Sequence, residues 1–104
     1  MGQQYGVYAP RAVCNYSKAA KWFERGAELG HAASKYEYGY ALLTALGVAR
    51  DLNRGLAHIR SAAELGNRLA LQFLLDTESQ HHYGFALLPQ EAEALRQRLD
   101  QLED

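Results

Sequence analysis

The sequence of 104 residues lacks the features that mark several classes of protein. It has one cysteine, two prolines and one tryptophan, and its net charge is −1. A single cysteine, Cys14, excludes an intramolecular disulfide and fits a reducing compartment. Nucleic-acid binders of this size normally carry an excess of basic residues, whereas this chain has 11 Lys and Arg against 12 Asp and Glu. We therefore expect no nucleic-acid partner.

Long apolar runs and targeting signals are also missing. No stretch approaches the ~20 apolar residues that cross a bilayer. The N-terminus has neither the basic lead nor the apolar run of a secretory signal. Gly6 stands where a myristoylation signal has Ser or Thr. These absences predict a cytoplasmic protein with no membrane partner.

What the sequence does contain is typical of one folded domain. Hydrophobic residues make up 48% of the chain and charged residues 22%, which excludes wholesale disorder. A length of 104 residues suffices for one core and is too short for two. We therefore treat residues 1–104 as a single domain.

The sequence repeats itself after a shift of 36 residues, from residue 17 to residue 53. Residues 17–31 (SKAAKWFERGAELGH) align without a gap with residues 53–67 (NRGLAHIRSAAELGN), and both copies contain the run AELG. Duplication at this period is typical of stacked helical hairpins. The repeat predicts an all-α fold, a short α/α solenoid of about two helical-hairpin repeats.

Each copy carries start and stop signals for a helix. Asn15 and Asp51 are suitable N-cap residues, and Gly30 and Gly66 stand where helices end in the left-handed conformation. The helical period places one set of mostly small and apolar side chains on the inner face of each helix. These are Ala19, Trp22, Phe23, Gly26 and Ala27 in the first copy, and Gly55, Leu56, Ile59, Ala62 and Ala63 in the second.

A second helix is expected after each terminal glycine. The first runs from residue 32 to about residue 44, with Ser34, Tyr38, Ala41 and Leu42 on one face. Gly39 in its middle costs ~1 kcal/mol relative to alanine, which indicates a helix contact too close for a Cβ atom. Residues 68 to about 77 begin a matching helix, and the pattern is lost by Asp76.

Residues 31–67 closely resemble a Sel-one-like repeat, a relative of the tetratricopeptide repeat. The positions that match the family pattern are Ser34, Tyr38, Gly39, Leu42, Gly47, Val48, Asp51 and residues 62–66. Ala45 stands where the family usually has its first loop glycine, and the resemblance covers about residues 5–75. It implies an α-superhelical scaffold that holds partner proteins, without catalytic residues and without a cofactor.

The flanks of the repeats divide the chain further. Residues 1–14 are expected to be a truncated first hairpin or an N-terminal arm, with Pro10 breaking any helix there, and residues 15–77 are the repeats. A solvent-exposed linker over residues 78–88 then leads to a C-terminal helix at 89–104, which begins at Pro89. Its apolar stripe consists of Ala92, Leu95, Leu99 and Leu102. This stripe predicts a cap on the solenoid, with pairing to a second copy or to a partner helix as the alternative.

The sequence holds little that points to catalysis. His81 and His82 are adjacent, but no H-x₃-H or C-x-x-C spacing supplies further metal ligands. We expect His58 to lie at the edge of the core and His31 to be structural. The chain is therefore predicted to be no enzyme and to bind no metal or cofactor. A metal-dependent enzyme using His81 and His82 is the remote alternative.

Candidate binding residues are those that the repeat itself does not need. These are Lys35, Tyr36, Tyr40 and Leu43, together with Tyr5 and Tyr8 near the N-terminus. Tyrosine is common at protein interfaces because it combines broad contact with a hydrogen-bonding tip. The equally weighted alternative is that Tyr36 and Tyr40 pack on the first hairpin.

The function predicted from the sequence is binding to another protein, as an adaptor or an inhibitor. Small stand-alone members of such repeat families in bacteria include immunity proteins that neutralise a cognate toxin, and this resemblance suggests a similar role by analogy. The alternative is a self-associating structural subunit, a homodimer formed through the solenoid ends or the C-terminal helix.

Overall fold

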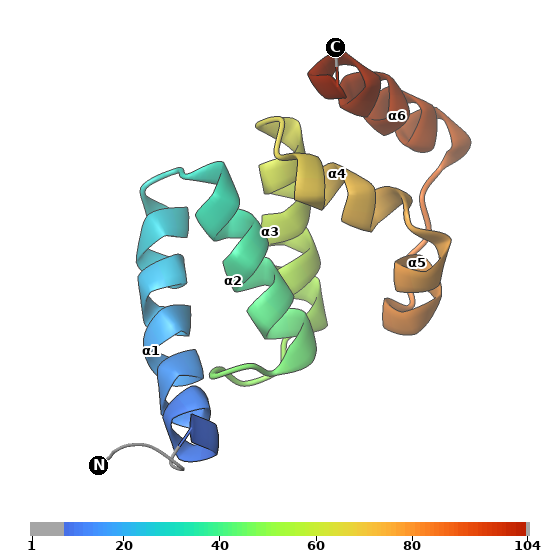
Figure 1. Ribbon diagram of the computed structural model, residues 1–104. Coiled ribbons are helices and arrows are strands. Elements are labelled where there is room, and N and C mark those ends of the chain that lie inside the picture. The colour runs from blue at the N-terminus through green and yellow to red at the C-terminus, as the bar shows by residue number, and fades with distance from the viewer. Residues whose placement is uncertain (1–7, 104) are drawn as a thin grey trace.

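Six helices make up the part of the chain that the computed structural model describes, which is the backbone of residues 8–103 and the side chains of residues 16–102. They are α1 (Tyr8–Glu28), α2 (Ala32–Thr44), α3 (Leu52–Glu64), α4 (Arg68–Leu75), α5 (Thr77–Tyr83) and α6 (Pro89–Glu103). Helices α1, α2 and α3 lie antiparallel and side by side, and the chain then continues away from α1 (Figure 1). The stack has α1 at one end and α6 at the other (Figure 1). The predicted all-α helical-hairpin fold is confirmed.

The helix boundaries follow the predicted local signals. The Asp51 side chain accepts a hydrogen bond from the Arg54 amide at 3.1 Å and caps α3. Asn67 caps α4 in the same way, accepting from the Ala70 amide at 2.9 Å. Gly30 and Gly66 follow α1 and α3 with φ of +91° and +92°, a conformation that glycine adopts at little cost.

Helices α2 and α3 cross at a pair of glycines. A Cβ atom on Gly39 would lie 2.7 Å from the Gly55 carbonyl oxygen, and one on Gly55 would lie 2.8 Å from the Gly39 carbonyl oxygen. Neither position has room for a side chain. The close contact predicted from Gly39 is therefore confirmed, and Gly55 supplies the other half of it.

The core runs between α2, α3 and α4. Its fully buried large side chains are Leu43, Ile59, Leu71 and Leu74, and Ala62, Ala63 and Ala70 are 0% exposed. A smaller cluster of Ala27, Tyr38 and Leu42 joins α1 to α2. Small residues at the helix contacts allow close approach, and the leucines and Ile59 fill the space beside them.

The start of α1 differs from the prediction. The helix begins at Tyr8, so Asn15 lies inside it rather than at its N-cap, and Pro10 does not break it. Pro10 is the third helical residue, where a backbone amide has no intrahelical acceptor, so the missing N–H costs no hydrogen bond. The boundary predicted at residue 14 therefore does not coincide with a break in the helix, which runs without interruption from Tyr8 through Asn15.

The predicted linker is also different. Asp76 ends α4 and caps α5 by accepting from the Glu78 amide at 2.9 Å, so a short helix occupies residues 77–83. Tyr83, Phe85 and Leu87 pack against the core instead of facing solvent. This segment belongs to the folded body, because removing its three large apolar side chains from water stabilises the folded state.

Helix α6 packs back on the stack. It begins at Pro89 as predicted, and Leu95 and Leu99 pack against the core cluster. Leu102, at the far end of the stripe, remains 42% exposed. The α6 helix thus covers the end of the solenoid next to α4, as expected for a cap.

Candidate functional site

Five aromatic side chains form one continuous patch, named here the aromatic surface: Tyr36 and Tyr40 of α2, Phe73 of α4, Tyr83 of α5, and Phe85. The Phe73 ring centre lies 6.2 Å from that of Tyr40 and 5.8 Å from that of Tyr83. Tyr36 and Tyr40, one helical turn apart, stack with ring centres 6.2 Å apart. The patch therefore joins α2, α4 and α5 across the repeat.

The rings differ in how far they are covered. Phe73 at the centre is 9% exposed, whereas Tyr40 at the edge is 37% exposed. Burial raises the pKa of the Tyr36 hydroxyl above its ordinary value, and the nearby Glu37 carboxylate adds to this effect. Like other tyrosine hydroxyls, it is neutral in the physiological range and can both donate and accept hydrogen bonds. A rigid aromatic patch with polar tips suits contact with another protein.

The structure separates the other predicted binding residues from this patch. Leu43 is 1% exposed and belongs to the core, so it offers no contact surface and that choice was wrong. The Lys35 ammonium group donates to the Ser61 hydroxyl at 2.8 Å and is directed toward α3. Tyr5 and the side chain of Tyr8 lie outside the described residues. Tyr36 and Tyr40 pack toward Phe73 of α4, and Tyr40 also faces α1. The alternative of packing on the first hairpin involves side chains of residues 1–15, which lie outside the described residues.

Tyr40 also reaches a second feature, a hollow of about 160 Å³ between α1 and α2. Tyr16, which is 48% exposed, lines the same hollow from α1. Its floor is apolar, formed by Ala20, Phe23 and Ala41. The exposed edge of the aromatic surface thus continues toward α1.

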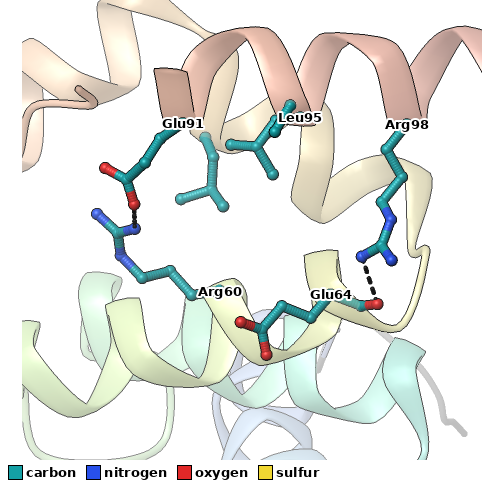
Figure 2. Close-up of a pocket in the computed structure, with 7 residues that line it drawn as sticks. Arg60, Glu64, Glu91, Leu95 and Arg98 are labelled. Carbon is teal, nitrogen blue, oxygen red and sulfur yellow. Dashed lines mark hydrogen bonds and ion pairs between the residues drawn. The ribbon is translucent and has the colours of Figure 1, made fainter. Parts of the chain in front are cut away.

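A larger open groove of about 390 Å³ lies between α3 and α6, with Leu74 of α4 also contributing to its lining. Figure 2 shows Leu95 between Glu91 and Arg98 on α6, facing Arg60 and Glu64 of α3. Arg60 pairs with Glu91 at 3.0 Å at one end (Figure 2). At the other end Arg98 donates to the Glu64 carbonyl at 2.5 Å, where it satisfies a free carbonyl group of the last turn of α3. Both arginines are therefore occupied in holding α6.

Glu91 has a local structural role as well. The Leu88 amide donates to its carboxylate at 3.2 Å and lowers the pKa of Glu91 below its ordinary value, with Arg60 acting in the same direction. This arrangement caps the first turn of α6. The polar groups of the groove thus serve to attach α6 to α3.

The histidines show no common site. His81 and His82 are exposed on α5, and within the described residues no group of three or more His, Cys, Asp and Glu side chains is placed to hold a metal ion. His58 packs edge-on against Tyr38 with ring centres 5.1 Å apart, at the edge of the core as predicted. Burial, together with the nearby Arg54 and Lys35 cations, lowers the pKa of His58 below its ordinary value. No helix in the described range is long and apolar enough to cross a membrane.

Sequence reasoning missed three members of the aromatic surface and the groove beside α6. Phe73 stands at the position that Glu37 occupies in the preceding copy, so the repeat gives no aromatic signal there. Tyr83 and Phe85 follow the point at which the repeat pattern is lost. The one sequence signal that the Tyr83 and Phe85 rings are buried was their spacing within the linker expected over residues 78–88.

Comparison with known proteins identifies the repeat. The family model described as the Sel1 repeat matches residues 1–31 and again residues 32–67. The second match spans α2 and α3, and the first ends just after α1. No curated protein and no solved structure matched the chain. With two matches that together cover more than half of its residues, the chain belongs to the Sel1 repeat family.

Proposed function

We propose that this chain is a non-catalytic protein-binding module and that the aromatic surface is its contact site. Sel1 repeats generally mediate protein–protein interaction. The observation that carries the proposal is the aromatic surface itself, in which Tyr40 stays 37% exposed while its ring is fixed against Tyr36 and Phe73. A ring held in place before binding loses little conformational entropy when a partner covers it.

The proposal extends to the type of binding. A small helical domain with a contact patch of this kind suits an adaptor or an inhibitor that covers part of a larger protein. An immunity-type role toward a cognate toxin remains a prediction by analogy. A cytoplasmic location and a bacterial source are likewise predictions.

The test compares three forms of the chain as bait in lysate from its source cells. Tyr40→Ala truncates the most exposed ring of the aromatic surface. Leu29→Ala is the matched control, because Leu29 is 71% exposed directly after α1 and does not line the hollow that Tyr40 lines. Loss of an interface anchor commonly costs about 2 kcal/mol or more, roughly a 30-fold loss of affinity.

We expect the wild type and Leu29→Ala to retain the same protein and Tyr40→Ala to lose it, with similar melting curves for all three. Equal retention by Tyr40→Ala would move the contact to another surface. If the wild type retains nothing beyond itself, the binding-module proposal fails, and a doubled mass in light scattering would favour the self-associating subunit.

A further inference from the structure

The outer face of α1, opposite to α2, has an unusual composition. Trp22 is 72% exposed there, and it lines a shallow hollow of about 280 Å³ together with Lys18, Lys21 and Arg25. Trp22 was predicted to lie on the inner face of the repeat, and the structure contradicts that prediction. The largest side chain type in proteins is left in water next to three cations, although its burial would stabilise the fold.

The internal repeat shows what normally covers this position. The residues of α3 that match Lys18, Trp22 and Arg25 are Arg54, His58 and Ser61, and all three contact α2. His58 packs on Tyr38, and the Arg54 guanidinium lies 6.0 Å from the centre of the same ring. Ser61 accepts the hydrogen bond from Lys35.

The neighbouring apolar positions are also less buried in α1 than in α3. In α3 they are buried beneath α2, whereas in α1 they are partly exposed and lie on the side toward α2, where Ala19 and Phe23 line the hollow between the two helices. The buried residues are Gly55, Ile59 and Ala62, and their partly exposed counterparts are Ala19, Phe23 and Gly26. Around Trp22 itself, α1 lacks within residues 8–103 the helix that α2 supplies to His58 of α3.

The charges on this face differ as well and indicate the chemistry of the missing helix. Lys21 and Arg25 replace two neutral residues of α3, Ala57 and Ser61. Neither they nor Lys18 pairs with any carboxylate among the side chains of residues 16–102. Two copies of the chain joined through this face would bring like charges together, which disfavours a second copy as the occupant.

We propose that the outer face of α1 binds an acidic amphipathic helix of a partner protein, seated on α1 as α2 is seated on α3. The apolar side of that helix covers Trp22, and its carboxylates face Lys21 and Arg25. This site is separate from the aromatic surface, so an experiment that rules out binding at one of them leaves the proposal for the other unchanged.

The chain contains one tryptophan, so its fluorescence reports on this face alone. The probe is a synthetic amphipathic peptide of about 18 residues, long enough to form a helix, with leucine on one side and glutamate on the other. A second peptide carries lysine in place of each glutamate. The matched protein control is the double variant Lys21→Ala and Arg25→Ser, which installs the residues of α3 and keeps Trp22.

With the glutamate peptide we expect the Trp22 emission of the intact chain to shift to shorter wavelength, with an affinity that falls as salt rises. The lysine peptide should bind about tenfold more weakly, and the double variant should lose most of this preference. Three results would overturn the proposal: no emission shift with the glutamate peptide, equal binding of both peptides, or a shift on concentrating the chain alone. Tighter binding of a single-stranded oligonucleotide than of the glutamate peptide would also overturn it.

Discussion

The loop between α2 and α3 contains two residues in the left-handed region of backbone conformation, Ala45 with φ +59° and Gly47 with φ +80°. A Cβ atom on Gly47 would collide with the backbone carbonyl of Tyr16, so glycine is required there for space as well as for conformation. Ala45 ends α2 and donates its amide to the Ala41 carbonyl. It is the one non-glycine residue with positive φ in the described part of the chain, and its backbone is strained.

We expect Ala45→Gly to raise the free energy of unfolding by about 1 kcal/mol, because glycine adopts this conformation without the Cβ clash. Urea unfolding of both forms measures the change. Gly30→Ala is the matched reverse, since Gly30 has φ +91° and nothing lies within 4 Å of the added Cβ atom. The Gly30→Ala change should lower the free energy of unfolding by a similar amount. Neutral or lower stability of Ala45→Gly would contradict the left-handed conformation of residue 45.

Residues whose role is set by neighbours in the chain could be predicted from the sequence, and residues whose role depends on the opposite helix could not. Asp51 as a cap and Gly39 as a contact position follow from local chemistry and spacing. Trp22 and Leu43 lie on amphipathic helices whose period fixes a face but not what covers it. The exposed position of Trp22 and the burial of Leu43 depend on which helix lies across from each.

At the scale of elements, α6 is the part that the repeat pattern does not contain and that completes the fold. Leu95 and Leu99 pack against the core cluster, and Arg98 and Glu91 attach the helix to α3. Without α6, the face of α4 that it covers would meet water. A solenoid of so few repeats depends on such end covers for its stability.

Deleting residues 89–104 should lower the free energy of unfolding by about 2–4 kcal/mol, given the apolar area that two half-buried leucines and the face beneath them remove from water. Urea unfolding and light scattering measure stability and association. Leu95→Ser should lose part of this stability, whereas Leu102→Ser, at an exposed site, should lose little. A truncated chain that is equally stable and monomeric would show that α6 is no cap.

The bounds of α2 and α3 and the start of α4 could be predicted because caps and glycines mark them, but the end of α4 and the start of α1 could not. The first copy has Ala9 and Arg11 where the second has the left-handed loop residues Ala45 and Gly47. Without a loop glycine the backbone continues as a helix through Asn15. Asn15 therefore aligns with Asp51 in the sequence, but unlike Asp51 it lies inside a helix and does not cap one.

The whole molecule is an elongated stack with different surfaces along its length (Figure 1). Helix α6 covers one end, the aromatic surface occupies the middle, and the cationic face with Trp22 lies at the α1 end. The two contact areas proposed above therefore lie on separate parts of the same stack. We propose that the central one carries the main interaction because its rings are already fixed in place.

The most direct test of this claim is amide hydrogen exchange of the chain with and without the protein that it captures. A partner seated on the aromatic surface should suppress local opening of the helices beneath it. We predict slower exchange in α2, α4 and α5, with α6 unchanged. Slowing confined to α3 and α6, or no slowing in α2 and α4, would contradict the claim that the aromatic surface is the binding site.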